Sequence, residues 1–192
     1  MAVAAARLES EAECLHAHLM AGAIGSDNDH VLACIYACWL TGGGALPDWL
    51  GLAPPSFRRL LAFHFPAVDT ATDGRIGRPL PAARCDEIDD LVALMWQHRA
   101  DEAPTRRWMA ELVAAACLGN DHLWQDLGLW HRGDLTALMQ RNFPSLAALN
   151  TKDMKWKRFL YRQLCEREGI RICRSPSCEA CDDFHACFGP EH

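Results

Sequence analysis

The sequence predicts an all-α protein, a helical bundle of six to seven helices followed by a C-terminal cysteine-rich loop. Apolar residues recur three and four positions apart through most of the chain, which is the spacing of an amphipathic helix. The period-two alternation and the β-branched clusters that indicate strands are nearly absent. Breaks rich in glycine and proline, such as residues 42–44 and 54–55, separate the helical segments.

Seven segments carry the helical spacing. In chain order they are residues 8–20, 29–41, 56–65, 86–99, 105–118, 133–142 and 151–168. The last segment has chemical stops at both ends, because Asn150 or Thr151 is a suitable N-cap and Gly169 suits the position after a helix end. We therefore expect the final helix to lead directly into the cysteine loop.

Two stretches of the chain share a pattern. Leu-x3-Leu-Gly-Leu at residues 46–52 recurs at residues 123–129, and the Phe-Pro pair at 65–66 recurs at 143–144, so the offset changes only from 77 to 78. The ordered agreement favours an internal repeat. The alternative is a chance match, since Leu-Gly-Leu and Phe-Pro are common.

The repeat suggests a domain organisation. We predict that residues 1–150 form a helical bundle in which 8–66 and 86–144 are two three-helix lobes. Residues 151–192 are then a C-terminal helix and a metal-cluster loop.

Composition limits the possible classes of protein. A chain of 192 residues, 50% hydrophobic and 23% charged, can bury a core without needing a metal to fold. The net charge of −6 argues against a nucleic-acid partner. The first residues turn acidic before any apolar core of a signal peptide, and no apolar run is long enough to cross a membrane. We expect a cytoplasmic protein, whose ten cysteines are ligands or core residues rather than disulfides.

Four of the cysteines crowd together near the end of the chain. They are Cys173, Cys178, Cys181 and Cys187, within fifteen residues. Soft sulfur ligands select iron–sulfur clusters, zinc or copper(I) over magnesium or calcium. A structural zinc site usually pairs two short knuckles a dozen or more residues apart, whereas one short loop can reach several corners of an iron–sulfur cube. The spacing favours an iron–sulfur cluster and leaves zinc as the alternative.

Further ligands are conceivable outside this quartet. Cys34 and Cys38 lie one helical turn apart, as a second ligand pair or, more commonly, as small buried core residues. Cys165 precedes the loop closely enough to add a thiolate. His185 lies inside the loop, where it can bind a metal or donate to a cluster sulfur.

Two other sets of side chains invite a functional interpretation. His16 and His18 are two positions apart, so on one helix they point to different sides and cannot chelate together. Lys155, Arg158 and Arg162 line one side of the final helix and can offset the charge of an anionic cluster or attract an oxyanion. The competing interpretation of this stripe is the solvated face of an amphipathic helix.

Several short motifs stand out in the C-terminal part: Asp-Met-Lys-Trp-Lys-Arg at 153–158, Tyr-Arg-Gln-Leu-Cys at 161–165, Glu-Gly at 168–169 and the cysteine loop with the Phe-Gly-Pro-Glu that follows it. With these motifs the C-terminal part resembles the NifQ family of nitrogen-fixation proteins. In the first half, Leu-Gly-Leu at 50–52 and His-Phe-Pro at 64–66 fit the same family.

The resemblance implies a molybdenum–iron–sulfur cluster ligated by Cys173, Cys178, Cys181 and Cys187. It further implies a molybdenum donor for synthesis of the iron–molybdenum cofactor of nitrogenase. The expected partners are the nitrogenase reductase and the cofactor-assembly scaffold complex, with molybdate as the metal source.

The expected activity is binding and transfer rather than catalysis. The sequence contains no nucleophile–base arrangement, phosphate loop or carboxylate pair with enzyme-like spacing. Two alternatives remain open: a helical electron-transfer or sensor protein with a four-iron cluster, and a zinc-stapled interaction module.

Overall fold

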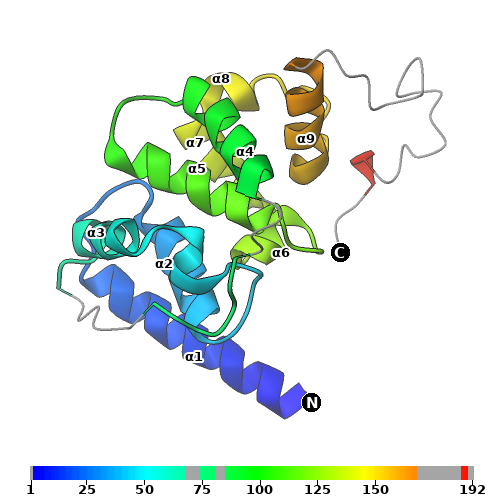
Figure 1. Cartoon of the computed structure of the whole chain (residues 1–192). Coiled ribbons are helices and arrows are strands. Elements are labelled where there is room, and N and C mark those ends of the chain that lie inside the picture. The colour runs from blue at the N-terminus through cyan, green and yellow to red at the C-terminus, as the bar shows by residue number, and fades with distance from the viewer. Residues whose placement is uncertain (1, 68–73, 81–84, 168–186, 190–192) are drawn as a thin grey trace.

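The computed structural model describes residues 2–67, 74–80, 85–167 and 187–189 (Figure 1). This part of the chain contains α-helices and one 3₁₀ helix and no strand, which confirms the all-α prediction. The helices are α1 (Ala2–Ala21), α2 (Asp29–Leu40), η1 (Asp48–Gly51), α3 (Pro54–His64), α4 (Cys85–Gln97), α5 (Pro104–Ala116), α6 (Leu123–Leu127), α7 (Arg132–Asn142), α8 (Pro144–Ala147) and α9 (Trp156–Arg167).

The described residues hold nine α-helices, more than the six to seven that the sequence predicts. The difference comes from α6 and α8, which have five and four residues. Apolar periodicity cannot reveal such helices, because it needs two or more turns to appear.

The core is built around α2 and α5. Both helices are buried over most of their length: α2 from Val31 to Ala37, and α5 from Trp108 to Ala116 apart from Glu111. A helix that is apolar on nearly all sides must be covered on several sides. Accordingly, α1 packs against α2, and α4 packs against α5 (Figure 1). The final helix, α9, also packs against α4.

Local sequence explains several helix ends. Pro54 and Pro104 each occupy the first turn of their helix, where the missing N–H costs nothing. Gly128 ends α6 with a φ of 79°, a left-handed conformation. A side chain at Gly128 would also meet the Cβ of Cys38 at 2.7 Å, so this glycine permits the close approach of α6 to α2.

The final helix begins later than predicted. It starts at Trp156, not at Thr151. Asn150 instead closes a turn, since its side chain accepts a hydrogen bond from the Met154 amide (2.8 Å) and donates one to the Met154 carbonyl (2.9 Å). Asp153 within this turn has a φ of 51° and is held by Arg132 through two hydrogen bonds of 2.9 Å. A helix cannot pass through a left-handed residue, so the turn delays it.

Equivalent positions of the proposed repeat share some backbone features. Gly51 and Gly128 both have left-handed φ values, 81° and 79°. Phe65 and Phe143 follow α3 and α7 with nearly the same conformation, φ/ψ of −131°/58° and −136°/57°. The segments before the glycines differ, because η1 contains left-handed residues whereas α6 is an ordinary right-handed helix. The division into lobes and domains stays a prediction.

Within the described ranges, none of the helices combines the length and the apolar character that a membrane-spanning segment requires.

Candidate functional site

Of the four predicted cluster ligands, Cys187 lies in the described part of the chain. Cys173, Cys178 and Cys181, and also His185, lie outside the described residues. Cys187 is half-buried, and both it and Phe188 pack against the core. The turn that contains them lies beside α9 (Figure 1), where the backbone amide of Lys155 donates a hydrogen bond of 2.9 Å to the carbonyl oxygen of Cys187. The last predicted ligand is therefore anchored to the residue that precedes α9.

An open pocket of about 400 Å³ lies at the same end of α9. Lys155, Lys157 and Arg158 line it from the start of the helix, and Asp121 and His122 line it from the segment before α6. Lys155 thus belongs both to the pocket wall and to the anchor of Cys187. The pocket and the end of the cysteine loop are neighbours.

The cations of this pocket differ in their partners. Lys157 forms an ion pair with Asp126, which is only 4% exposed, and also donates a hydrogen bond of 2.9 Å to the Gly119 carbonyl. Burial raises the pKa of Asp126, and the hydrogen bond and charge of Lys157 oppose that rise. Lys157 therefore serves mainly to balance a buried carboxylate that joins α6 to α9.

The predicted stripe of Lys155, Arg158 and Arg162 is not uniform. Arg158 is exposed on the pocket wall. Arg162, one turn further along, forms an ion pair of 2.7 Å with Glu166 on the surface of α9. The side chain of Arg162 is not among those that line the pocket. The structure brings Lys155 and Arg158 to the site and leaves Arg162 away from it.

Cys34 and Cys38 both lie on α2, in unequal settings. Cys34 is fully buried, and burial, with the charges of Asp134 and Cys38, raises its pKa to about 12. Cys38 is half-buried, and burial raises its pKa while Arg78 opposes the rise. Both thiols are therefore protonated near neutral pH when no metal is bound.

Cys165, the other thiol that the sequence singles out, is half-buried on α9. Among the described residues, Cys14, Cys34, Cys38, Cys117, Cys165 and Cys187 are free thiols. None of these six forms a disulfide.

The structure also reveals a group that the sequence analysis missed. His16 does not pair with His18; it meets His30 at the start of α2, and His30 in turn lies beside Cys34. The spacing His30-x3-Cys34 was visible in the sequence as two potential ligands one helical turn apart. The approach of His16 from α1 was not visible, because it depends on how α1 packs against α2.

Comparison with known proteins gives consistent matches. The family model described as NifQ matches residues 31–189, which includes all four loop cysteines. The chain is 45% identical to the protein NifQ of Azotobacter vinelandii over 160 residues, covering 78% of this chain and 82% of that protein. It is 39% identical to NifQ of Klebsiella pneumoniae, covering 78% of this chain and 93% of that protein.

A third relative, NifQ of Rhodobacter capsulatus, is 36% identical, with 78% of this chain and 81% of that protein covered. No solved structure matches the chain significantly. Because both the family model and these relatives span most of the sequence, the chain belongs to the NifQ family and has a role in nitrogen fixation.

Proposed function

We propose that the protein is a metal-cluster carrier that donates molybdenum for synthesis of the iron–molybdenum cofactor of nitrogenase. Cys173, Cys178, Cys181 and Cys187 hold an iron–sulfur core that accepts molybdenum derived from molybdate. The protein binds and transfers the metal in the cytoplasm without catalytic turnover. Its recipients are the nitrogenase reductase and the cofactor-assembly scaffold complex.

The observation that carries this proposal is membership of the NifQ family over a range that contains the whole cysteine quartet. The donor chemistry fits, since four closely spaced thiolates suit an iron–sulfur core better than a hard cation.

The surroundings of Cys187 add a physical argument. Its carbonyl is fixed to the Lys155 amide, beside a pocket with Lys155 and Arg158 on its wall. Thiolate-ligated clusters and molybdate are both anionic, so cations at this position favour either of them. Molybdate must exchange oxide ligands for sulfide before it enters a cluster, and a pocket next to the loop can hold the oxyanion while that exchange proceeds.

The test is analysis of iron, sulfide and molybdenum in protein purified without oxygen from molybdate-fed cells. We expect a brown protein that contains all three elements. The Cys178→Ser variant should lose most of its iron and molybdenum, whereas Cys14→Ser, which changes an exposed cysteine of α1, should keep both. Circular dichroism of both variants checks that their helices are intact.

The alternatives give different results. A protein that contains iron and sulfide but no molybdenum after molybdate feeding would be an electron-transfer or sensor protein. A colourless protein that contains only zinc would be a zinc-stapled interaction module. Either result would overturn the proposal.

A further inference from the structure

Three potential metal ligands from two helices meet at a place that the proposed function does not use. His30 and Cys34 lie one turn apart on α2, and His16 reaches them from α1. The Nε2 atom of His16 lies 3.0 Å from Nδ1 of His30, and the Sγ atom of Cys34 lies 3.8 Å from Nε2 of His30. One donor atom from each of the three residues falls within 4.8 Å of the others.

These separations suit a single metal ion. In a tetrahedral zinc site with Zn–N near 2.0–2.1 Å and Zn–S near 2.3 Å, adjacent ligand atoms are roughly 3.3–3.6 Å apart. The two distances above use different nitrogens of His30, and an ion would bind only one of them. Since one donor atom from each residue lies within 4.8 Å of the other two, side-chain shifts of about an ångström would bring the three to these separations.

The surroundings of the three residues also fit a metal site. Trp130 packs on His16, with ring centroids 4.6 Å apart, and shields one side of the group. Asp134 lies close enough to Cys34 to act on it electrostatically, and its charge would help to balance a bound cation.

We propose that His16, His30 and Cys34 form a second metal site, which binds one divalent ion of borderline softness such as zinc. Two imidazoles and one thiolate select zinc or a similar transition metal over magnesium and calcium. Binding replaces the thiol proton of Cys34, so one proton is released for each metal–sulfur bond formed. Three protein ligands leave a fourth position for water or another donor.

This site uses none of the four loop cysteines, and it does not depend on the proposed function. The family match begins at residue 31, so His16 and His30 lie outside the matched range. The bound ion would join α1 to α2 near the N-terminus of α2, where the two helices already pack together. Its expected effect is to hold α1 in place.

The experiment uses full-length protein in which Cys173, Cys178, Cys181 and Cys187 are replaced by serine, so that the loop binds no metal. Cobalt(II) is titrated as a spectroscopic probe, and zinc is measured by competition with a chelating dye. We expect one equivalent of metal and a thiolate-to-cobalt charge-transfer band in the near ultraviolet. Zinc should raise the melting temperature, because it binds the folded state.

Variants of the triad formed by His16, His30 and Cys34 distinguish this site from adventitious metal binding. In the same background, Cys34→Ala should abolish the charge-transfer band, and His16→Ala and His30→Ala should each weaken zinc binding by more than about tenfold. The control variants His18→Ala and Cys14→Ser change exposed residues of α1, the helix that carries His16, and should bind zinc as the background protein does. His30 is itself exposed, so its replacement is not expected to disturb the core.

Absence of the cobalt–thiolate band in the background protein would overturn the proposal and leave a hydrogen-bonded histidine pair. Equal zinc affinity in the triad variants and the controls would overturn it as well. Neither result would affect the molybdenum experiment, since that experiment reports on the C-terminal cysteines.

Discussion

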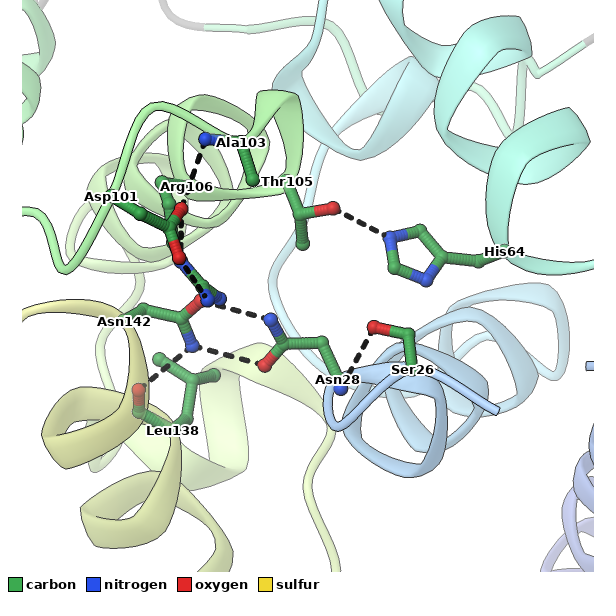
Figure 2. Close-up of polar contacts among 9 residues, drawn as sticks. All are labelled: Ser26, Asn28, His64, Asp101, Ala103, Thr105, Arg106, Leu138 and Asn142. Carbon is green, nitrogen blue, oxygen red and sulfur yellow. Dashed lines mark hydrogen bonds and ion pairs between the residues drawn. The ribbon is translucent and has the colours of Figure 1, made fainter. Parts of the chain in front are cut away.

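Asn28 and Asn142 exchange two hydrogen bonds through their buried side-chain amides, although 114 positions separate them (Figure 2). The two N···O distances are 2.9 and 3.0 Å. Asn142 also donates to the Leu138 carbonyl (2.8 Å) and accepts from Arg106 (2.7 Å). The pair fixes the residue before α2 to the last residue of α7, and so joins the first half of the chain to the second.

Replacing Asn142 with alanine should destabilise the fold markedly. The change leaves the amide of Asn28 without its partner in the core, and an unsatisfied buried polar group costs about 1–3 kcal/mol. We expect urea unfolding to show a loss of this size for Asn142→Ala. Gln140→Ala, on the exposed side of the same helix, should change the free energy of unfolding by less than about 0.5 kcal/mol. Similar losses in both variants would contradict a structural role for the amide pair.

His64 and Thr105 make a second buried contact, at positions that the predicted repeat pairs with Asn142 and Asn28. Thr105 is 77 positions after Asn28, and Asn142 is 78 positions after His64. Figure 2 shows the two contacts, in which Nε2 of His64 lies 3.0 Å from the Thr105 hydroxyl. Nδ1 of His64 lies 2.6 Å from the Asp29 carboxylate, which can only accept, so this nitrogen carries the proton and Nε2 accepts from Thr105.

Stability should fall as the pH is lowered through this histidine's range. Burial lowers the pKa of His64 in the folded state, although Asp29 opposes that effect, so the unfolded chain takes up the proton first. The stabilising contribution of the neutral ring is therefore complete above the unfolded value near 6.5 and is lost progressively below it. The loss cannot exceed about 1.4 kcal/mol per pH unit for one proton.

The measurement is the free energy of unfolding of wild type and His64→Gln between about pH 7.5 and about pH 5.5. The variant should show a smaller decrease over this interval, because glutamine does not titrate. His18→Gln, at an exposed position of α1, should follow the wild-type profile. Parallel profiles for wild type and His64→Gln would exclude His64 as the source of the pH dependence.

The ion pair between Lys157 and Asp126 supports the segment that borders the pocket. Lys157→Met leaves the buried carboxylate without its cation and should cost about 1–3 kcal/mol at neutral pH. Burial already raises the pKa of Asp126, and loss of Lys157 should raise it further, so the carboxyl can become neutral as the pH falls. The difference from wild type should therefore shrink in mild acid.

Urea unfolding of Lys157→Met at neutral and mildly acidic pH tests this expectation. The control is Lys152→Met, at an exposed position a few residues earlier, which should show little change at either pH. A destabilisation of Lys157→Met that stays constant with pH would point to lost packing rather than to an unpaired carboxylate.

Arg158 and Arg162 provide a matched pair for the molybdenum site. Arg158 lines the pocket beside Cys187, whereas Arg162 is held by Glu166 on the helix surface. Arg158→Gln should reduce molybdenum loading by about two- to fivefold, corresponding to about 0.5–1 kcal/mol for one exposed charge. Arg162→Gln should leave loading unchanged. The quantity to measure is the ratio of molybdenum to iron in protein purified without oxygen. Equal ratios in the two variants would show that the pocket does not contribute to molybdenum binding.

The sequence by itself determined the helical class and most of the long helices. Repeated apolar spacing over twelve or more residues, as in α4, indicates the buried face of a helix directly. The prolines in the first turns of α3 and α5 and the glycine after α6 indicate helix ends, because the backbone angles that these residues allow are local properties. The cysteine quartet and the family motifs are also properties of the chain alone.

Tertiary structure decided the features that depend on contacts between distant segments. The final helix α9 begins later than the sequence predicts, because Arg132, from α7, holds Asp153 in a left-handed turn. The division of the stripe into Arg158 at the pocket and Arg162 away from it follows from which side of α9 faces the segment before α6. His16 meets His30 and Cys34 only because α1 packs against α2, and helical spacing within one segment cannot report the angle or register between two helices.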